Sequence, residues 1–130
     1  MAGEKILIVE DNLDNMKLFV SVLRIEGYRV VEASSPREVP DLVKVERPDL
    51  ILMDIQLPEM DGVTLMNQIR ERMGGEQPVI VALTAHAMRG DDEKYLSAGF
   101  DGYISKPLNV ASFDRQVGNL LRQARANFKA

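Results

Sequence analysis

The sequence contains no cysteine among its 130 residues, which excludes disulfide bonds and thiolate chemistry. No apolar run approaches the roughly 20 residues that a membrane-spanning helix needs. The N-terminal segment MAGEKILIVED has too short an apolar run for a signal peptide, and Ala2 does not fit the myristoylation pattern. We therefore expect a cytoplasmic protein that does not insert into membranes.

A large excess of charge of either sign is also absent. The chain has 20 acidic and 16 basic residues, giving a formal net charge of −4 at pH 7. This balance favours solubility and gives no reason to expect DNA or an anionic membrane as a partner. The length suits one compact domain, which we predict at residues 1–125, followed by a C-terminal tail at 126–130 and no output domain.

Five short apolar segments occur at fairly even intervals, and stretches with helical spacing lie between them. Segments rich in Ile, Leu and Val without polar alternation are typical of parallel strands that are covered on both faces. The predicted strands are residues 5–9, 28–33, 49–53, 78–83 and 101–105. Strands that alternate with helices in this way predict an α/β sandwich around a parallel sheet.

Apolar residues at helical spacing predict the buried faces of three helices. The residues are Leu13, Met16, Val20 and Leu23; Val63, Met66 and Ile69; and Phe113, Val117, Leu120 and Leu121. Gly27, Gly74 and Gly99 suit the left-handed ends of helices, and Asp61 suits a helix N-cap. Pro40 conflicts with the second helix, because proline removes a backbone hydrogen bond. Either that helix is distorted at its start or it begins near Pro40.

Polar residues follow four of the predicted strands directly. Right-handed crossovers bring the carboxyl ends of all parallel strands to one edge of the sheet, and ligands bind at such edges. We therefore expect three carboxylates, a hydroxyl and an ammonium group to converge there. The strand-end residues are Glu10 and Asp11, then Asp54, then Thr84 and Ala85, and finally Ser105, Lys106 and Pro107.

Three neighbouring carboxylates repel one another, and a hard divalent cation removes that conflict. Mg²⁺ prefers oxygen ligands, including one or two carboxylates and several waters. We predict Asp11 and Asp54 as direct ligands, Glu10 as a ligand through water, and the Gln56 backbone carbonyl as a further ligand. Mn²⁺ is an alternative ion for the same site.

A carboxylate at this edge is also a potential nucleophile, because aspartate accepts phosphoryl groups as an acyl phosphate. Phosphoryl transfer requires positioning and neutralisation of charge on the transferred oxygens. Lys106 and a metal ion would supply the positive charge, and the Thr84 hydroxyl and nearby backbone amides would donate hydrogen bonds. Asp54 is the candidate acceptor.

Four segments resemble the motifs of response-regulator receiver domains from two-component signalling. They are ILIVEDN at 6–12, LILMDIQLPEMDG at 50–62, VIVALTA at 79–85 and YISKP at 103–107. The four occur in the family's order and spacing, and the match covers essentially the whole chain. The resemblance implies a flavodoxin-like (βα)5 sandwich with a five-stranded parallel sheet in the order 2-1-3-4-5.

The resemblance also implies a role for each matching residue. Asp54 would be the phosphoacceptor, with Glu10 and Asp11 as the metal-binding acidic pair. Lys106, Thr84 and Ala85 would contact the phosphoryl group. Tyr103 would be the switch aromatic, turning inward when Thr84 moves towards that group, and Pro107 would follow a cis peptide bond.

The chain is similar to small stand-alone receivers such as the cell-cycle regulator DivK. That similarity implies a single-domain regulator, not an enzyme, apart from slow self-dephosphorylation. Its partners would be a sensor histidine kinase or a histidine phosphotransfer protein, and a downstream effector protein. A phosphorelay shuttle and a receiver excised from a hybrid kinase remain alternatives.

Two functions of other classes also remain open. One is a phosphohydrolase with an aspartyl-phosphate nucleophile, similar to the haloacid-dehalogenase phosphatases. That family has a general acid two residues after the nucleophile, where this chain has Gln56. The other is a binding module whose acidic site performs no chemistry.

Overall fold

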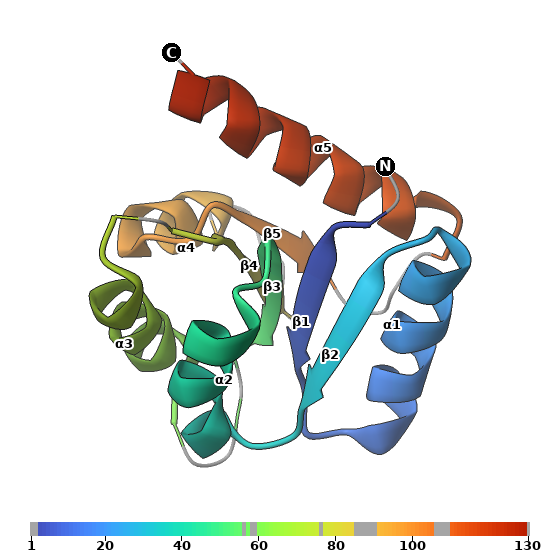
Figure 1. Cartoon of the computed structure of the whole chain (residues 1–130), viewed down its shortest axis with the longest axis horizontal. Helices are drawn as coiled ribbons and strands as arrows, with labels where there is room; N and C mark the ends of the chain where they lie inside the picture. The colour runs from blue at the N-terminus through green and yellow to red at the C-terminus, as the bar shows by residue number, and fades with distance from the viewer. Residues whose placement is uncertain are drawn as a thin grey trace.

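The computed structural model describes residues 3–55, 57, 60–75, 77–84, 91–105 and 110–129. Within them, a five-stranded sheet lies between two layers of helices (Figure 1). The elements are β1 (Lys5–Val9), α1 (Leu13–Ile25), β2 (Arg29–Ala33), the 3₁₀ turn η1 (Pro36–Glu38), α2 (Val39–Glu46), β3 (Leu50–Asp54), α3 (Gly62–Met73), β4 (Val79–Thr84), α4 (Asp91–Ala98), β5 (Gly102–Ser105) and α5 (Val110–Lys129). The predicted α/β sandwich is confirmed.

The strands lie in the order β2-β1-β3-β4-β5, and each neighbouring pair is parallel. This is the flavodoxin-like order that the resemblance implied. The register sets Val9 at the end of β1 beside Met53, and Asp54 beside Leu83. The carboxyl ends of the three central strands therefore meet at one edge of the sheet.

The buried side chains form two clusters, one on each face of the sheet. Successive residues of a strand point to opposite faces. Ile8, Leu52 and Leu83 accordingly pack with residues of α1 and α5, whereas Val9 and Met53 pack with residues of α2, α3 and α4. The central strands β3 and β4 are buried along their whole length because helices cover both faces, whereas the edge strand β2 is partly exposed and β5 ends in the exposed Ser105.

The prediction of a buried helix face is wrong for two residues. Leu13 is 71% exposed and Val63 is 37% exposed. Both lie in the first turn of their helix, near the carboxyl edge of the sheet, where the strands end and the core stops. Phe19 and Leu65 are buried in these helices instead. The other predicted positions of α1, α3 and α5 are buried, or in the case of Leu120 partly buried.

The start of the second helix combines the two alternatives raised by Pro40. The 3₁₀ turn η1 comes first, with the Ser35 side chain accepting a hydrogen bond from the Arg37 N–H. Helix α2 then begins at Val39, so Pro40 lies in its first turn. A proline costs no helical hydrogen bond there, because the first N–H groups of a helix have no partner within it.

The ends of the other helices follow the predicted pattern. Gly27, Gly74 and Gly99 have φ angles of 93°, 61° and 120°, which side chains rarely allow.

Helix α5 continues to Lys129, so the residues expected as a tail from 126 onwards extend the helix, and the domain boundary stays a prediction. In the described part of the chain, no helix has the length and apolar character needed to cross a membrane.

Asp61 caps α3, as predicted, on the connection that leaves Asp54. Its carboxylate accepts hydrogen bonds from the Thr64 backbone N–H at 2.8 Å and the Thr64 hydroxyl at 3.0 Å. These bonds, the backbone one first, lower the pKa of the Asp61 carboxyl below its usual value. Replacing an N-cap residue by alanine typically costs about 1 kcal/mol, so Asp61→Ala should lower the free energy of unfolding by about that amount.

The same cap should make stability depend on pH. A lowered pKa in the folded state means that the charged cap stabilises above the unfolded pKa of about 3.9, and that this contribution disappears as the pH falls through the folded value. Asp61→Asn retains a capping side chain without a titrating group. In urea unfolding at neutral and at acidic pH, the wild type should therefore lose more stability on acidification than Asp61→Asn. Parallel losses in the two proteins would contradict this assignment.

Gly62 allows the connection after β3 to fold back on itself. A Cβ atom at Gly62 would lie 2.9 Å from the Cα of Ile55, and the Gly62 N–H donates to the Ile55 carbonyl at 3.3 Å. Gly62→Ala should lower the free energy of unfolding by about 1–3 kcal/mol, the usual cost of an overpacked site. Gly75→Ala is the matched control, because a Cβ there meets nothing within 4 Å. Equal effects of the two substitutions in urea unfolding would refute the close approach at Gly62.

Candidate functional site

The carboxylates of Glu10, Asp11 and Asp54 form a cluster at the carboxyl edge of the sheet. Glu10 and Asp11 directly follow β1, and Asp54 is the last residue of β3, the neighbouring strand. One oxygen of each carboxylate lies within 4.8 Å of the others. The structure therefore brings together the three acids that the sequence predicted at this edge.

The cluster is partly shielded from water. Glu10 and Asp54 are only 1% and 6% exposed, whereas Asp11 is exposed. The Asn12 backbone N–H donates to the Glu10 carboxylate at 3.2 Å, and the Asn12 side chain caps α1 by accepting from the Asn15 N–H. The turn into α1 thus holds Glu10 in place. Like charges at this separation repel one another, and low exposure strengthens the repulsion.

The donor set fits a hard divalent cation. Two oxygens bound to one Mg²⁺ at 2.0–2.1 Å lie at most about 4.2 Å apart, slightly less than the 4.8 Å that bounds this cluster. A small movement, or a water between one carboxylate and the ion, is enough to complete such a site. Asp54 and Asp11 are the residues that would hold the ion directly, and Glu10 would contact it through a water molecule.

Thr84 also lies at the carboxyl edge of the sheet, but its side chain points to the face opposite to that of Asp54. It is the last residue of β4 and is 1% exposed. Alternation along the strand puts its side chain on the face of Ile80 and Ala82, which pack with α2, α3 and α4. The Thr84 Oγ1 lies 3.3 Å from the hydroxyl of Tyr95 in α4.

Tyr103 lies in β5 beside Ala82 of β4 and is half-buried on this same face. Its ring centroid is 6.3 Å from that of Tyr95, which in turn is 6.3 Å from the ring of Phe100. Thr84 and Tyr103 are thus connected through Tyr95, a residue that the sequence interpretation missed. The available signal in the sequence was that Tyr95 is followed closely by two further aromatic residues, Phe100 and Tyr103.

Four predicted site residues lie outside the described residues. They are Gln56, Ala85, Lys106 and Pro107. Their roles stay predictions. Ser105, which pairs with Thr84 at the end of β5, is the last described residue before Lys106.

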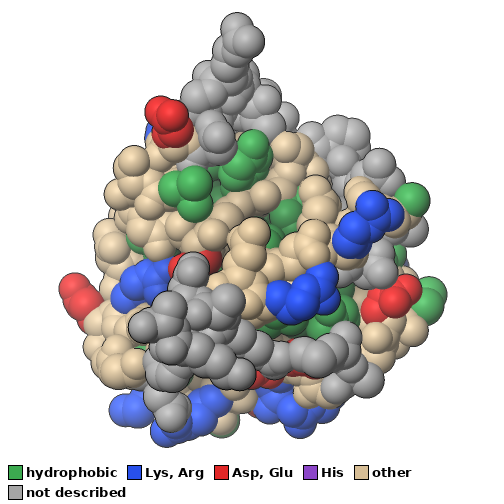
Figure 2. All heavy atoms as spheres, turned by 90° about the horizontal axis from the view of Figure 1, so that it is seen from above, with side chains coloured by type: hydrophobic (Ala, Val, Ile, Leu, Met, Phe, Trp, Pro, Cys, Tyr) green, Lys and Arg blue, Asp and Glu red, His purple; other side chains and the backbone are tan. Residues whose placement is uncertain are grey.

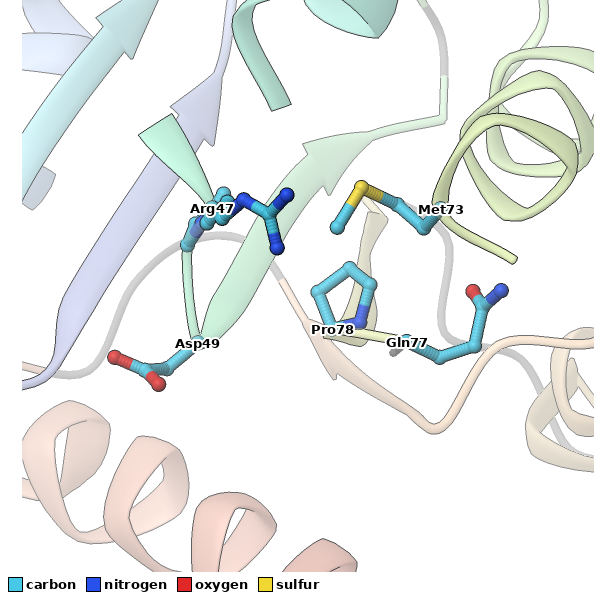
Figure 3. A pocket seen from close by; sticks show the side chains of 6 residues that line it. Arg47, Asp49, Met73, Gln77 and Pro78 are labelled. Atoms are coloured by element: carbon cyan, nitrogen blue, oxygen red, sulfur yellow. The ribbon is translucent and has the colours of Figure 1, made fainter. Parts of the chain in front are cut away.

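A separate pocket lies at the opposite edge of the sheet (Figure 3). It has a volume of about 190 Å³ and is formed by the starts of β3 and β4 and the end of α3. Arg47 enters it from the end of α2 with a φ of 49°, an unusual backbone conformation for a residue other than glycine. The lining residues are Arg47, Pro48, Asp49, Met73, Gln77 and Pro78.

Acidic, basic and apolar side chains are interspersed on the face shown in Figure 2. No single-sign field dominates among the described side chains on that face. An extended basic stripe is the usual electrostatic footprint of a nucleic-acid-binding domain. This face gives no support for such a partner.

Curated relatives match the chain along nearly their whole length. The polar-differentiation response regulators DivK of Brucella anthropi and Brucella abortus are each 39% identical to it over 121 residues, which cover 93% of this chain and 98% of theirs. The family profile described as the response regulator receiver domain matches residues 6–117.

Solved structures agree with these matches. The receiver domain of the sensor histidine kinase PA1611 from Pseudomonas aeruginosa, which has a magnesium ion coordinated in its active site cleft, is 38% identical with a TM-score of 0.80, covering 92% of this chain and 98% of that one. The chemotaxis response regulator CheY4 of Vibrio cholerae has a TM-score of 0.83 at 23% identity, covering 92% and 99%, and shows a shared fold. This chain belongs to the response regulator receiver domain family of two-component signalling.

Proposed function

We propose that Asp54 accepts a phosphoryl group from a phosphohistidine of a sensor kinase or of a histidine phosphotransfer protein. The observation that carries this proposal is the position of Asp54. It ends a buried central strand and has the carboxylates of Glu10 and Asp11 within 4.8 Å. The surrounding sheet holds the acceptor rigidly, which favours a defined angle of attack.

The reaction forms an acyl phosphate. A carboxylate oxygen of Asp54 attacks the phosphorus atom, the bond from phosphorus to the histidine nitrogen breaks, and the electron pair of that bond stays on the imidazole. Asp11 and Asp54 would hold Mg²⁺, or Mn²⁺ in its place, with Glu10 acting through water, and the ion would supply positive charge that neutralises the transferred oxygens. Lys106 would add a second positive charge, and the Thr84 hydroxyl would donate a hydrogen bond.

Phosphorylation would then shift a two-state equilibrium. Thr84 moves towards the new phosphoryl group, Tyr103 turns inward, and the surface formed by α4, β5 and α5 changes. That surface would bind the downstream effector protein. The 39% identity to DivK along nearly the whole length of that protein supports a DivK-like regulator of cell polarity or the cell cycle, with a phosphorelay shuttle as the alternative. Self-dephosphorylation would be slow.

Intact-mass spectrometry tests this proposal. The protein is incubated with Mg²⁺ and either acetyl phosphate or an autophosphorylated histidine kinase. We expect the mass to rise by one phosphoryl group, and hydroxylamine to remove that group because it cleaves acyl phosphates. No gain in mass with either donor, or a label that hydroxylamine leaves in place, would reject Asp54 as the acceptor.

A further inference from the structure

The hydroxyl groups of Thr84 and Tyr95 meet in a nearly water-free part of the protein. Thr84 is 1% exposed and Tyr95 is 6% exposed, and their oxygens are 3.3 Å apart. Hydrogen bonds between hydroxyl groups usually measure 2.7–2.8 Å, so this contact is weak and costs little to break. It joins the end of β4 directly to the middle of α4.

Tyr95 cannot readily follow Thr84 if the threonine moves. Its ring packs edge-on against Phe100 and tilted against Tyr103. Its backbone carbonyl accepts from the Phe100 N–H at 3.1 Å. The Arg70 guanidinium of α3 donates to the Gly99 carbonyl at 2.7 Å and to the Asp101 carboxylate at 3.1 Å. The end of α4 is therefore fastened to α3, and Tyr95 with it.

The pleat of the sheet sets the direction in which Thr84 would have to move. Asp54 follows Met53 in β3, and Met53 points to the face of α2, α3 and α4, so alternation directs Asp54 to the opposite face. Thr84 points to the face of Tyr95. A Thr84 hydroxyl that reaches a phosphoryl group on Asp54 must turn away from Tyr95 and lose this contact.

We propose that Tyr95 is a positioning residue that holds the Thr84 hydroxyl away from Asp54 until the phosphoryl group arrives. This inference rests on the proposed function of Asp54 and Thr84. An interaction made in only one of two states shifts the equilibrium towards that state. The Tyr95 hydroxyl thus opposes phosphorylation, and it connects Thr84 directly to α4, one of the elements of the surface proposed to change.

Tyr95→Phe tests this role, because it removes the hydroxyl and keeps the ring packing. The probe is beryllofluoride with Mg²⁺, a stable mimic of an aspartyl phosphate, and binding is followed by ¹⁹F NMR titration. We expect Tyr95→Phe to bind it about two- to fivefold more tightly than the wild type, as loss of one weak neutral hydrogen bond predicts. Tyr28→Phe is the matched control, since Tyr28 is a buried tyrosine of the cluster on the other face, and it should bind as the wild type does.

The Thr84→Ala background separates positioning from a general effect on packing. Adding Tyr95→Phe to Thr84→Ala should leave beryllofluoride affinity unchanged, because the partner hydroxyl is already gone. Equal or weaker binding by Tyr95→Phe in the wild-type background, or an undiminished gain in the Thr84→Ala background, would overturn the role of Tyr95 while leaving the proposed function intact. Failure of the wild type to bind beryllofluoride would overturn both.

Discussion

Asp54→Asn is expected to reduce phosphoryl uptake from acetyl phosphate or a phosphorylated kinase to background. The amide has nearly the same shape as the carboxylate but is a poor nucleophile, so the acyl phosphate cannot form. The side chain is buried beside two other carboxylates, and the substitution removes one of three mutually repelling charges. We therefore expect the thermal midpoint to be equal to or above that of the wild type, which separates loss of chemistry from loss of fold. Intact mass and a thermal scan measure the two quantities.

Asp61→Asn is the control for this experiment. Asp61 is an exposed aspartate that follows the same strand, but it caps α3 through Thr64. Asparagine caps a helix about as well as aspartate, so this variant should take up phosphoryl groups as the wild type does. Labelling of Asp54→Asn to the level of Asp61→Asn would place the acceptor elsewhere in the chain.

The strands and helices were predictable from the sequence because their buried residues form recognisable apolar patterns. Short apolar segments marked all five strands. The apolar run is unbroken in the central strands, which helices cover on both faces, whereas the edge strand β2 includes Arg29 and Glu32 and is partly exposed. The order of the strands could not be predicted in this way, because hydrophobic spacing does not specify which strands are neighbours. It came from the family resemblance. Leu13 and Val63 were placed wrongly, because helical spacing gives the direction of a side chain but not where the sheet beneath it ends.

The candidate site was predictable to the extent that it lies at strand ends. Right-handed crossovers put the carboxyl ends of β1 and β3 at the same edge of the sheet, so Glu10, Asp11 and Asp54 could be assigned to that edge before their distances were known. The strand boundaries were less accurate, since Asp54 and Thr84 are the last residues of their strands instead of the first after them. Strand register therefore positions both side chains directly.

The Tyr95 contact was not predictable from spacing. Thr84 and Tyr95 are 11 residues apart along the chain, on two elements whose packing depends on the whole α3–α4 face. A strand period or a helical period describes one element at a time, whereas this contact depends on how α4 lies against β4 and β5. Contacts that join two elements through one pair of polar atoms are visible only in three dimensions.

Removal of divalent cations is expected to abolish phosphoryl uptake by the wild type, and Asp11→Asn is expected to weaken Mg²⁺ binding at least about tenfold. Even outer partners of metal ligands typically contribute about 10- to 100-fold to metal affinity, and Asp11 is the exposed member of the cluster, open to an ion from solvent. Without the ion, the incoming phosphoryl oxygens would meet three carboxylates and no compensating charge from the cluster. Calorimetric titration with Mg²⁺, and intact mass after incubation with acetyl phosphate in EDTA, measure the two effects.

Asp14→Asn controls for the loss of one negative charge near the same helix. Asp14 is an exposed residue in the first turn of α1 and lies outside the acidic cluster. If Asp11 holds the ion, Asp14→Asn should bind Mg²⁺ about as tightly as the wild type, since exposed charges contribute little at moderate salt. Equal weakening by both substitutions would mean that the acidic end of the molecule attracts Mg²⁺ only diffusely. Uptake that continues in EDTA would show that Asp54 is activated without a metal, and the positive charge would then have to come from the protein itself, with Lys106 as the first residue to replace.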